Sequence, residues 1–600
     1  MSATTVHRAF ARSKGPAVAL AAILLLGAAL RLHRLSETPA GLFCDEVAIA
    51  VNARALATTG HDLAGVRLPL YSRLRSYELS GIPGIVSQPI FQYASVPFAL
   101  ALGRTPLAVR LPAVAFGVLG IAATWLLGRA LFGAATGLGA AALLAISPWH
   151  LHFSRVGFEA VSLPALLALC AWQLVTGTRR PRRLVAGAVL AALATYAYPP
   201  AQVFVPLLLV GFVAIYRREL RAQPRALALA VLALAVLEIP NLWTVATGAN
   251  RARLGQTLIT QASLGRERSV QWLAERREHS ALAGAVLDDR RLLLPFVFAW
   301  SYASHLSPRF LFLEGDANPR HHPTRFGACP LFYAPLLLAG AVALVRRRRE
   351  PASRLLLWWL ATWPLPASLA VEAPHAIRAI TALPALELAA ALGLVTLAAP
   401  ARGRAPAGTR ILLRRLAAAA VAIAAVAETA SFLRFYHGEY RVRSAPEWQA
   451  GLGPALREIA RRRPEHARTF LPERLVGLHA FALFFGDIEP AALDPAEGPR
   501  EQLAHMGYAL AAPGERVTMQ PGDLWLVREA ERRQASWREL ARFPYPDGTP
   551  NLYVVEWPGP AGAARGDADP TARGGRSSSA NGSSAASIPS ARAPAPGGPR

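Results

Sequence analysis

Long apolar segments recur along most of the chain and constrain its fold more than any other feature. A helix needs about 20 mostly apolar residues to cross a bilayer. Segments near this length occur at 15–32, 108–128, 132–148, 159–176, 183–198, 199–216, 225–243, 329–346, 354–371, 380–399 and 411–432. Apolar residues make up 53% of the 600 positions, which agrees with this class. We therefore predict an all-α polytopic membrane protein.

Arginine-rich connections give the predicted orientation. They follow alternate apolar segments, at 179–183, 217–221, 346–349 and 402–415. Because basic loops are retained in the cytoplasm, these connections and the N-terminus are predicted to be cytoplasmic. The membrane would be a bacterial inner membrane, with the C-terminal part in the periplasm. This pattern accounts for the formal charge of +26 without a nucleic-acid partner.

Two further apolar pieces, Phe91–Gly103 and Leu292–Ser304, are shorter than the eleven predicted spans and too short to cross the bilayer. Counting either one alone would break the alternation of basic loops, so we predict that both are interfacial or re-entrant helices on the outer face. If both crossed, the chain would have thirteen spans with the same orientation, and this model stays open.

Composition divides the chain into three predicted parts. Residues 1–439 form the transmembrane domain, and residues 440–558 form a small water-soluble α/β domain outside the cytoplasm. Within the second part a helix is predicted at 454–463, with strands at 524–528 and 552–557. Residues 559–600 are rich in Gly, Ala, Ser, Pro and Arg and are predicted to be a disordered tail.

Asp45 and Glu46 form an acidic pair just after the first apolar segment, on the predicted outer face. A carboxylate there can accept a proton from an attacking hydroxyl or hold a divalent cation. We predict Asp45 as the general base, with Glu46 supporting it. The alternative is a helix N-terminus, in which Asp45 is the cap and Glu46 is favoured by the dipole of the run Val47–Leu56.

Polar residues in three further outer-face loops suggest substrate binding. The segment Ser147–Arg155 contains His152 and Arg155, and an aromatic belt is the alternative explanation for its rings. A loop rich in Arg, His and Asp contains Arg320, and its adjacent His321 and His322 are not predicted to share one metal ion.

The third of these loops, before the span at 380–399, places His375 and Arg378 three residues apart. On a helix they would share one face, and an arginine at the membrane surface can bind a lipid phosphate bidentately. The alternative is that Arg378 only anchors the chain at the interface.

The three cysteines, Cys44, Cys170 and Cys329, do not have a metal-binding spacing. Cys44 and Cys329 fall on the same predicted side of the membrane, so they could form a disulfide or remain free thiols.

In their order along the chain, these features resemble family 39-type glycosyltransferases of the GT-C fold, the group with protein O-mannosyltransferases and the aminoarabinose transferase of lipid A. The residues that carry the resemblance are Asp45-Glu46, Gly60–Tyr71 with Asp62, Arg110-Leu111-Pro112, Ser147–Arg155 and His375–Arg378. Ala48 and Ile49 stand where characterised members have a basic and an aromatic residue.

The resemblance implies transfer of a sugar, with inversion, from a polyprenyl-phosphate donor to an extracytoplasmic lipid, protein or polysaccharide. Asp62 joins Arg155, Arg320, His375, Arg378 and His152 as a predicted substrate-binding residue. A divalent cation, if required, would bind at Asp45 and Glu46. The alternatives are a transporter or lipid flippase, which would place ionisable groups near the membrane midplane, and an inactive glycolipid-binding relative.

Overall fold

The computed structural model describes residues 15–247, 280–399 and 407–559, apart from 83, 371, 513–516 and 534–535, and a few positions between 271 and 277. The chain forms two compact units. Unit 1 comprises residues 1–38 and 87–440, and unit 2 comprises residues 39–86 and 441–600. The predicted tail lies almost entirely outside the described residues.

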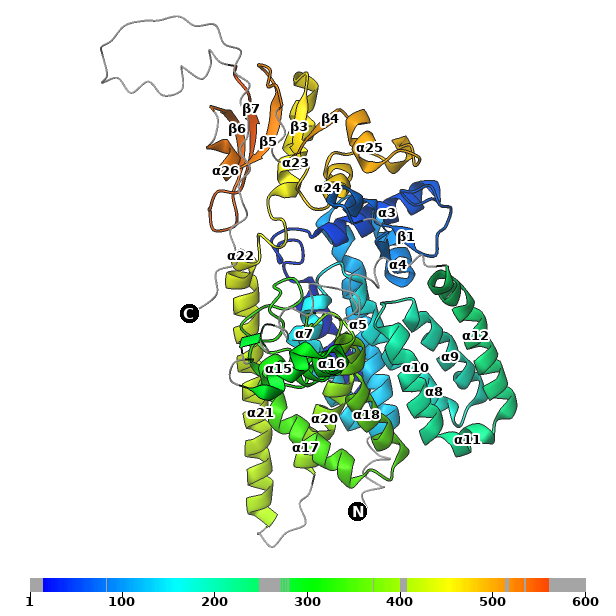
Figure 1. Cartoon of the computed structure of the whole chain (residues 1–600). Coiled ribbons are helices and arrows are strands. Elements are labelled where there is room, and N and C mark those ends of the chain that lie inside the picture. The colour runs from blue at the N-terminus through cyan, green and yellow to red at the C-terminus, as the bar shows by residue number, and fades with distance from the viewer. Residues whose placement is uncertain are drawn as a thin grey trace, which may run out of the picture. The chain divides into compact units, whose positions relative to one another are not determined.

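Unit 1 is helical in its described residues (Figure 1). Its α-helices are α2 Gly15–Leu32, α4 Pro89–Leu102, α5 Pro106–Phe132, α6 Ala134–Ile146, α7 Pro148–Phe153, α8 Ser162–Gly177, α9 Pro181–Thr195, α10 Ala201–Ile215, α11 Arg217–Arg221, α12 Pro224–Ala246, α15 Ala281–Asp288, α16 Arg290–His305, α17 Tyr333–Arg346, α18 Pro351–Thr362, α19 Pro364–Ser368, α20 Ala385–Ala398 and α21 Ala407–Phe435. Shorter helical turns include η2 Glu159–Val161, η4 Arg309–Leu313, η5 Ile380–Ala382 and η6 Tyr436–Tyr440.

Local sequence explains where these helices start and stop. Helix α5 begins at Pro106, whose missing N–H costs nothing at a first helical position. The preceding Thr105 caps the helix by accepting a hydrogen bond from the Ala108 N–H at 3.2 Å. The helix ends at Phe132, and the next residue, Gly133, has a φ of 97°, a conformation that favours glycine.

The predicted fold class is confirmed. Each of the eleven predicted spans overlaps helical structure, with the span at 354–371 divided between α18 and α19. Six helical segments of the described chain are long and apolar enough to cross a membrane. They are Gly15–Leu32, Pro106–Phe132, Glu159–Gly177, Pro224–Thr244, Ile380–Ala398 and Arg415–Arg443. The two shorter apolar pieces are also helical, as α4 and α16. Whether they cross the membrane stays a prediction.

Unit 2 contains a five-stranded mixed sheet in the order β4-β3-β5-β7-β6 (Figure 1). Its strands are β3 Thr469–Pro472, β4 Tyr508–Ala511, β5 Leu524–Arg528, β6 Arg538–Phe543 and β7 Leu552–Glu556. Strand β3 pairs in parallel with β4 and β5, whereas β7 is antiparallel to β5 and β6. The two predicted strands match β5 and β7, and the predicted helix matches α23, Leu452–Arg462.

The segment that carries the acidic pair belongs to unit 2. Its helix α3, Cys44–Thr59, packs against α24, Leu478–Phe485, every residue of which is buried. The approach is close at Gly477, where an added Cβ would lie 2.3 Å from the Cys44 Cβ. Unit 2 therefore combines an N-terminal loop with the C-terminal domain, a combination that the division at residue 440 did not include.

Other elements of unit 2 are short. They are η1 Arg75–Ser80, α22 Arg441–Arg443, η7 Arg463–Glu465, η8 Pro490–Ala492, α25 Pro499–His505 and α26 Glu529–Arg532, and a small ribbon pairs β1 Ser72–Arg73 with β2 Val86–Ser87. Cys44 in unit 2 and Cys170 and Cys329 in unit 1 are all buried, and whether Cys44 and Cys329 pair stays a prediction.

Candidate functional site

Three segments of unit 1 hold the loop before η5 in a fixed position. The Ala376 N–H donates to Asp316 Oδ2 at 2.7 Å, and Trp149 Nε1 donates to the Ala376 carbonyl at 3.1 Å. The His375 N–H donates to His305 Nε2 at 3.1 Å. Asp316, Trp149 and His305 come from the loop after η4, from α7 and from the end of α16. The loop is therefore built into the unit rather than exposed on it.

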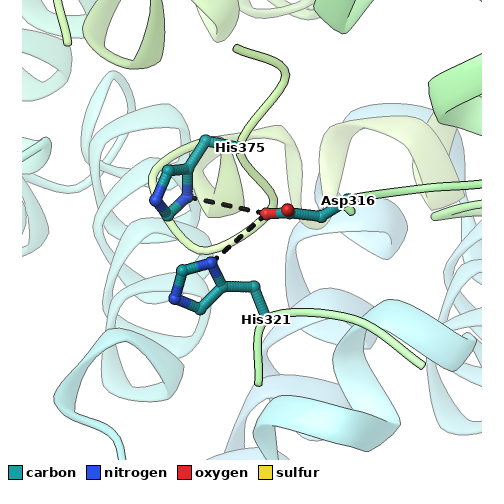
Figure 2. A group of neighbouring side chains, drawn as sticks. All are labelled: Asp316, His321 and His375. Atoms are coloured by element: carbon teal, nitrogen blue, oxygen red, sulfur yellow. Dashed lines mark ion pairs between the residues drawn. The ribbon is translucent and has the colours of Figure 1, made fainter. Parts of the chain in front are cut away.

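Asp316, His321 and His375 form a compact cluster at this junction (Figure 2). Asp316 Oδ2 lies 3.4 Å from His321 Nδ1 and 3.7 Å from His375 Nδ1. The two imidazole rings are stacked, with centroids 4.4 Å apart and planes inclined by 27°. Asp316 Oδ1 also accepts the Asn318 N–H at 2.9 Å, which fixes the carboxylate plane.

Burial and nearby charges set the protonation of this cluster. Burial lowers the pKa of His375 well below its usual value, and the positive charges of Arg378 and Arg320 act in the same direction, as do His321 and His305. Burial alone would raise the pKa of Asp316, but the neighbouring His321 and two backbone N–H donors leave it lowered. At neutral pH the cluster therefore contains a carboxylate and a neutral His375.

The structure brings three of the predicted substrate-binding residues into this region, namely Arg320, His375 and Arg378. Arg320 and Arg378 are partly buried, and both are close enough to affect the charge state of His375. Asp316 and His321 were missing from the predicted site. Their signal was the density of Asp, Arg and His between residues 316 and 322, but contact with His375 depends on the fold.

The structure separates the adjacent histidines of this loop. His321 faces Asp316 and His375, while His322 Nε2 lies 3.1 Å from the Gly327 carbonyl. His322 is fully buried and helps to close its own loop. The two adjacent rings therefore have different partners.

His152, a predicted substrate-binding residue, is fully buried and connects two segments of unit 1 through its two ring nitrogens. Its Nε2 lies 2.8 Å from the Arg320 carbonyl, and its Nδ1 lies 3.2 Å from the Tyr436 hydroxyl. Burial lowers its pKa to about 3, although the Arg320 carbonyl acts against this shift. A neutral ring that donates from Nε2 satisfies both contacts. His152 thus supports the position of Arg320.

Arg155 lies among backbone carbonyls of unit 1, and its predicted role in phosphate binding stays a prediction. Its guanidinium is fully buried. It donates to four backbone carbonyls, at distances of 2.9, 2.7, 3.3 and 3.3 Å, belonging to Leu30, Arg31, Arg34 and Thr38. These carbonyls lie at or after the end of α2, where a helix leaves its last carbonyls without partners. We therefore assign Arg155 to the anchoring of this segment.

In unit 2, Asp45 and Glu46 lie in the first turn of α3, whose N-cap is Phe43. Asp45 is therefore not the cap, contrary to the alternative considered above. The Phe43 N–H donates to the buried Glu46 carboxylate at 2.9 Å, which satisfies an N-terminal donor of the helix. Asp45 is partly exposed, and its Oδ1 lies 3.8 Å from Cys44 Sγ. The two carboxylates thus have different environments.

Asp62 organises the turn that follows α3. One carboxylate oxygen accepts the N–H groups of Ala64 and Val66 at 3.0 and 2.9 Å, and the other accepts the Arg73 N–H at 3.3 Å. Asp62 is 4% exposed, so these bonds define a loop-forming role. Ala48 and Ile49, the two departures from the family pattern, are buried in α3.

The described residues contain one group of three or more side chains placed to hold a metal ion, Asp316, His321 and His375. Asp45 and Glu46 are not part of it.

Comparison with known proteins agrees with the helical architecture. Residues 87–243 match the family model described as "Dolichyl-phosphate-mannose-protein mannosyltransferase". No curated protein matches the chain.

Solved structures extend the similarity beyond that region. The chain resembles apo ArnT from Cupriavidus metallidurans at 14% identity and a TM-score of 0.52, covering 90% of this chain and 98% of ArnT. It resembles ArnT bound to undecaprenyl phosphate at 15% identity and a TM-score of 0.50, covering 91% of this chain and 98% of ArnT. It also resembles the Archaeoglobus fulgidus oligosaccharyltransferase tethered with an acceptor peptide, at 12% identity and a TM-score of 0.51, covering 91% of this chain and 74% of that enzyme. This chain is therefore a multi-pass membrane protein with the fold of the GT-C glycosyltransferases.

Proposed function

We propose that the chain is an integral membrane glycosyltransferase that moves a sugar from a polyprenyl-phosphate donor to an extracytoplasmic acceptor. The observation that carries this proposal is the cluster of Asp316, His321 and His375 in unit 1. Arg320 and Arg378 lie close to it, within a GT-C fold. Two arginines beside a carboxylate–histidine cluster suit an anionic substrate. The undecaprenyl phosphate bound to ArnT supports a lipid phosphate as that anion.

The reaction requires a base for the acceptor and positive charge for the leaving group. As the acceptor oxygen attacks the anomeric carbon, the bond from that carbon to the phosphate oxygen breaks, with inversion. We assign Asp45 as the base that removes the proton from the attacking hydroxyl of the acceptor substrate. Glu46 is not assigned this role, because its carboxylate already accepts the Phe43 N–H at the start of α3. Arg320 and Arg378 are assigned to the departing lipid phosphate, whose negative charge they stabilise.

The test of this function is a comparison of cells that contain the protein with cells that lack it. Glycolipids, surface polysaccharides and proteins from both are analysed by mass spectrometry. We expect one sugar modification to disappear and its polyprenyl-phosphate precursor to accumulate. Unchanged products together with unchanged precursor would contradict the proposal.

Arg378→Ala is expected to weaken donor use. Loss of charge-assisted contacts to a phosphate costs roughly 1.5–3 kcal/mol, so KM for the lipid donor should rise about 10–100-fold. Arg378→Lys should recover part of this loss, because lysine keeps the charge without the bidentate geometry. The measurement is initial rate against donor concentration in purified membranes.

Arg309→Ala is the matched control for this variant. Arg309 precedes the same loop but is 75% exposed in its side chain, where it pairs with the exposed Glu314 at 2.6 Å. Exposed pairs contribute little, so donor KM should remain unchanged. An equal rise of KM in both variants would refute a specific role for Arg378.

The composition of unit 2 supports a topology prediction. Residues 39–86 and 441–559 belong to one compact unit. We expect both parts to lie on the same side of the membrane, so the chain between them crosses an even number of times. Of eleven predicted spans, one precedes residue 39 and ten lie between residues 87 and 440. If α4 and α16 also crossed, to give thirteen spans, twelve would lie in that interval. A single crossing by α4 or α16 alone would break this parity.

A tag after residue 600 should therefore share its accessibility with a tag inserted in the exposed turn at Gly81. With the basic loops in the cytoplasm, both tags should react with an impermeant reagent from the periplasmic side. A tag at the N-terminus provides the opposite control. Cytoplasmic exposure of the C-terminal tag would overturn the proposed orientation.

A further inference from the structure

We propose that Asp316 Oδ2, His321 Nδ1 and His375 Nδ1 bind one divalent transition-metal ion, with Zn²⁺ as the preferred ion. The three ligand atoms lie within 4.8 Å of one another (Figure 2). Its ligands differ from Asp45 and Glu46, the residues at which a divalent cation was predicted from the sequence.

The distances in the cluster suit a shared ion better than direct hydrogen bonds. The carboxylate oxygen lies 3.4 and 3.7 Å from the two Nδ1 atoms, beyond the usual range for an N–H···O bond. Metal–ligand bonds of about 2.0–2.2 Å in a tetrahedral zinc site separate the ligand atoms by roughly 3.3–3.6 Å. Small movements would therefore complete the coordination geometry.

The imidazole nitrogens provide an independent observation. His321 Nδ1 and His375 Nδ1 are both buried and have no hydrogen-bond partner in the described part of the chain. The His375 side chain is only 5% exposed. Unsatisfied buried polar atoms are rare and unfavourable, and a metal ion between these nitrogens and the carboxylate would satisfy both.

The surrounding contacts hold the ligands in place. The Ala376 N–H bonds to Asp316 Oδ2, leaving a second lone pair on that oxygen for a metal. His375 Nε2, the nitrogen away from Asp316, lies 3.7 Å from a Glu372 carboxylate oxygen. Carboxylates beside the outer nitrogen commonly orient metal-binding histidines.

The donor set selects the class of ion. Two imidazole nitrogens and one carboxylate oxygen suit Zn²⁺ and similar transition metals, whereas Mg²⁺ and Ca²⁺ prefer oxygen ligands. Three protein ligands leave a fourth position for water or an anionic oxygen atom. The positive charge of Arg320 and Arg378 nearby favours an anion in that position.

The test uses the full chain purified in detergent with a tag that lacks histidine. After dialysis against a chelator, the protein is titrated with Zn²⁺ and, separately, with Co²⁺, whose visible absorption reports tetrahedral coordination. We expect one tightly bound ion per chain. His321→Gln and His375→Gln should each raise the Kd at least about tenfold. His505→Gln, at a side chain that is 72% exposed in unit 2, should leave the Kd unchanged.

Chain integrity is checked by size-exclusion chromatography, and the Co²⁺ spectrum of the unmutated chain tests the site without any substitution. A tetrahedral spectrum that is lost in His321→Gln and kept in His505→Gln supports the proposal. Absence of stoichiometric binding in the unmutated chain overturns it, and so does a Kd in both the His321→Gln and His375→Gln variants that equals the Kd of the unmutated chain. Because the readout is metal content and spectrum, the result is distinct from the outcome for glycosyl transfer.

Discussion

Cells that carry Asp45→Asn in place of the natural protein are expected to lose the sugar modification while retaining the protein in the membrane. An amide cannot accept the acceptor proton, and removal of a general base costs about 10²–10⁴-fold in rate. Asp45 is partly exposed in the first turn of α3, so asparagine should fit without repacking. The measurement is product by mass spectrometry, normalised to protein detected in membranes.

Glu46→Gln is the matched control, one residue along the same helix. A glutamine at this position can still accept the Phe43 N–H. Loss of the charge from the first turn should lower stability by about 0.3–1 kcal/mol through the helix dipole, while most activity remains. If Glu46→Gln abolished transfer and Asp45→Asn did not, the two roles would be reversed. Full activity in both would remove the acidic pair from the mechanism.

The helical part of the fold could be predicted because a bilayer demands long apolar segments. Each predicted span overlaps helical structure, and the fold class follows from that pattern together with the basic loops. The short strands β3, β4 and β6 of unit 2 were not predicted. Every residue of strand β3, Thr469–Pro472, is buried. The strand therefore lacks the alternation of apolar and polar residues that identifies a half-buried strand in a sequence.

The candidate site was predictable only in part because its contacts join distant segments. Arg320, His375 and Arg378 were found as polar residues in loops beside apolar spans. The partnership of Asp316 with His375 joins positions about sixty residues apart and depends on the hydrogen bond to Ala376. The environment of Arg155 could not be predicted either. Local sequence does not reveal that its guanidinium is directed toward backbone carbonyls.

Arg155→Ala is expected to destabilise the protein strongly rather than to weaken donor binding selectively. The change removes a buried charge-assisted donor from carbonyls between Leu30 and Thr38. It also removes the contact of the guanidinium with the Tyr436 ring, 5.4 Å away. Such losses in a buried position cost about 3–5 kcal/mol. The measurement is unfolding in detergent, followed by thermal scans and by the yield of monodisperse protein.

Arg325→Ala separates this structural effect from a general loss of positive charge. Arg325 has a side chain that is 62% exposed and pairs with Glu439 at 2.6 Å. Removal of such a surface pair should change stability by about 1 kcal/mol or less. Arg155→Lys should fall between the two, since one ammonium group cannot reach all four carbonyls with guanidinium geometry. If Arg155→Ala had normal stability and a raised KM for the donor, Arg155 would instead be a phosphate ligand. The segment after α2 would then depend on other contacts, such as the hydrogen bond from Arg110 to the Leu35 carbonyl.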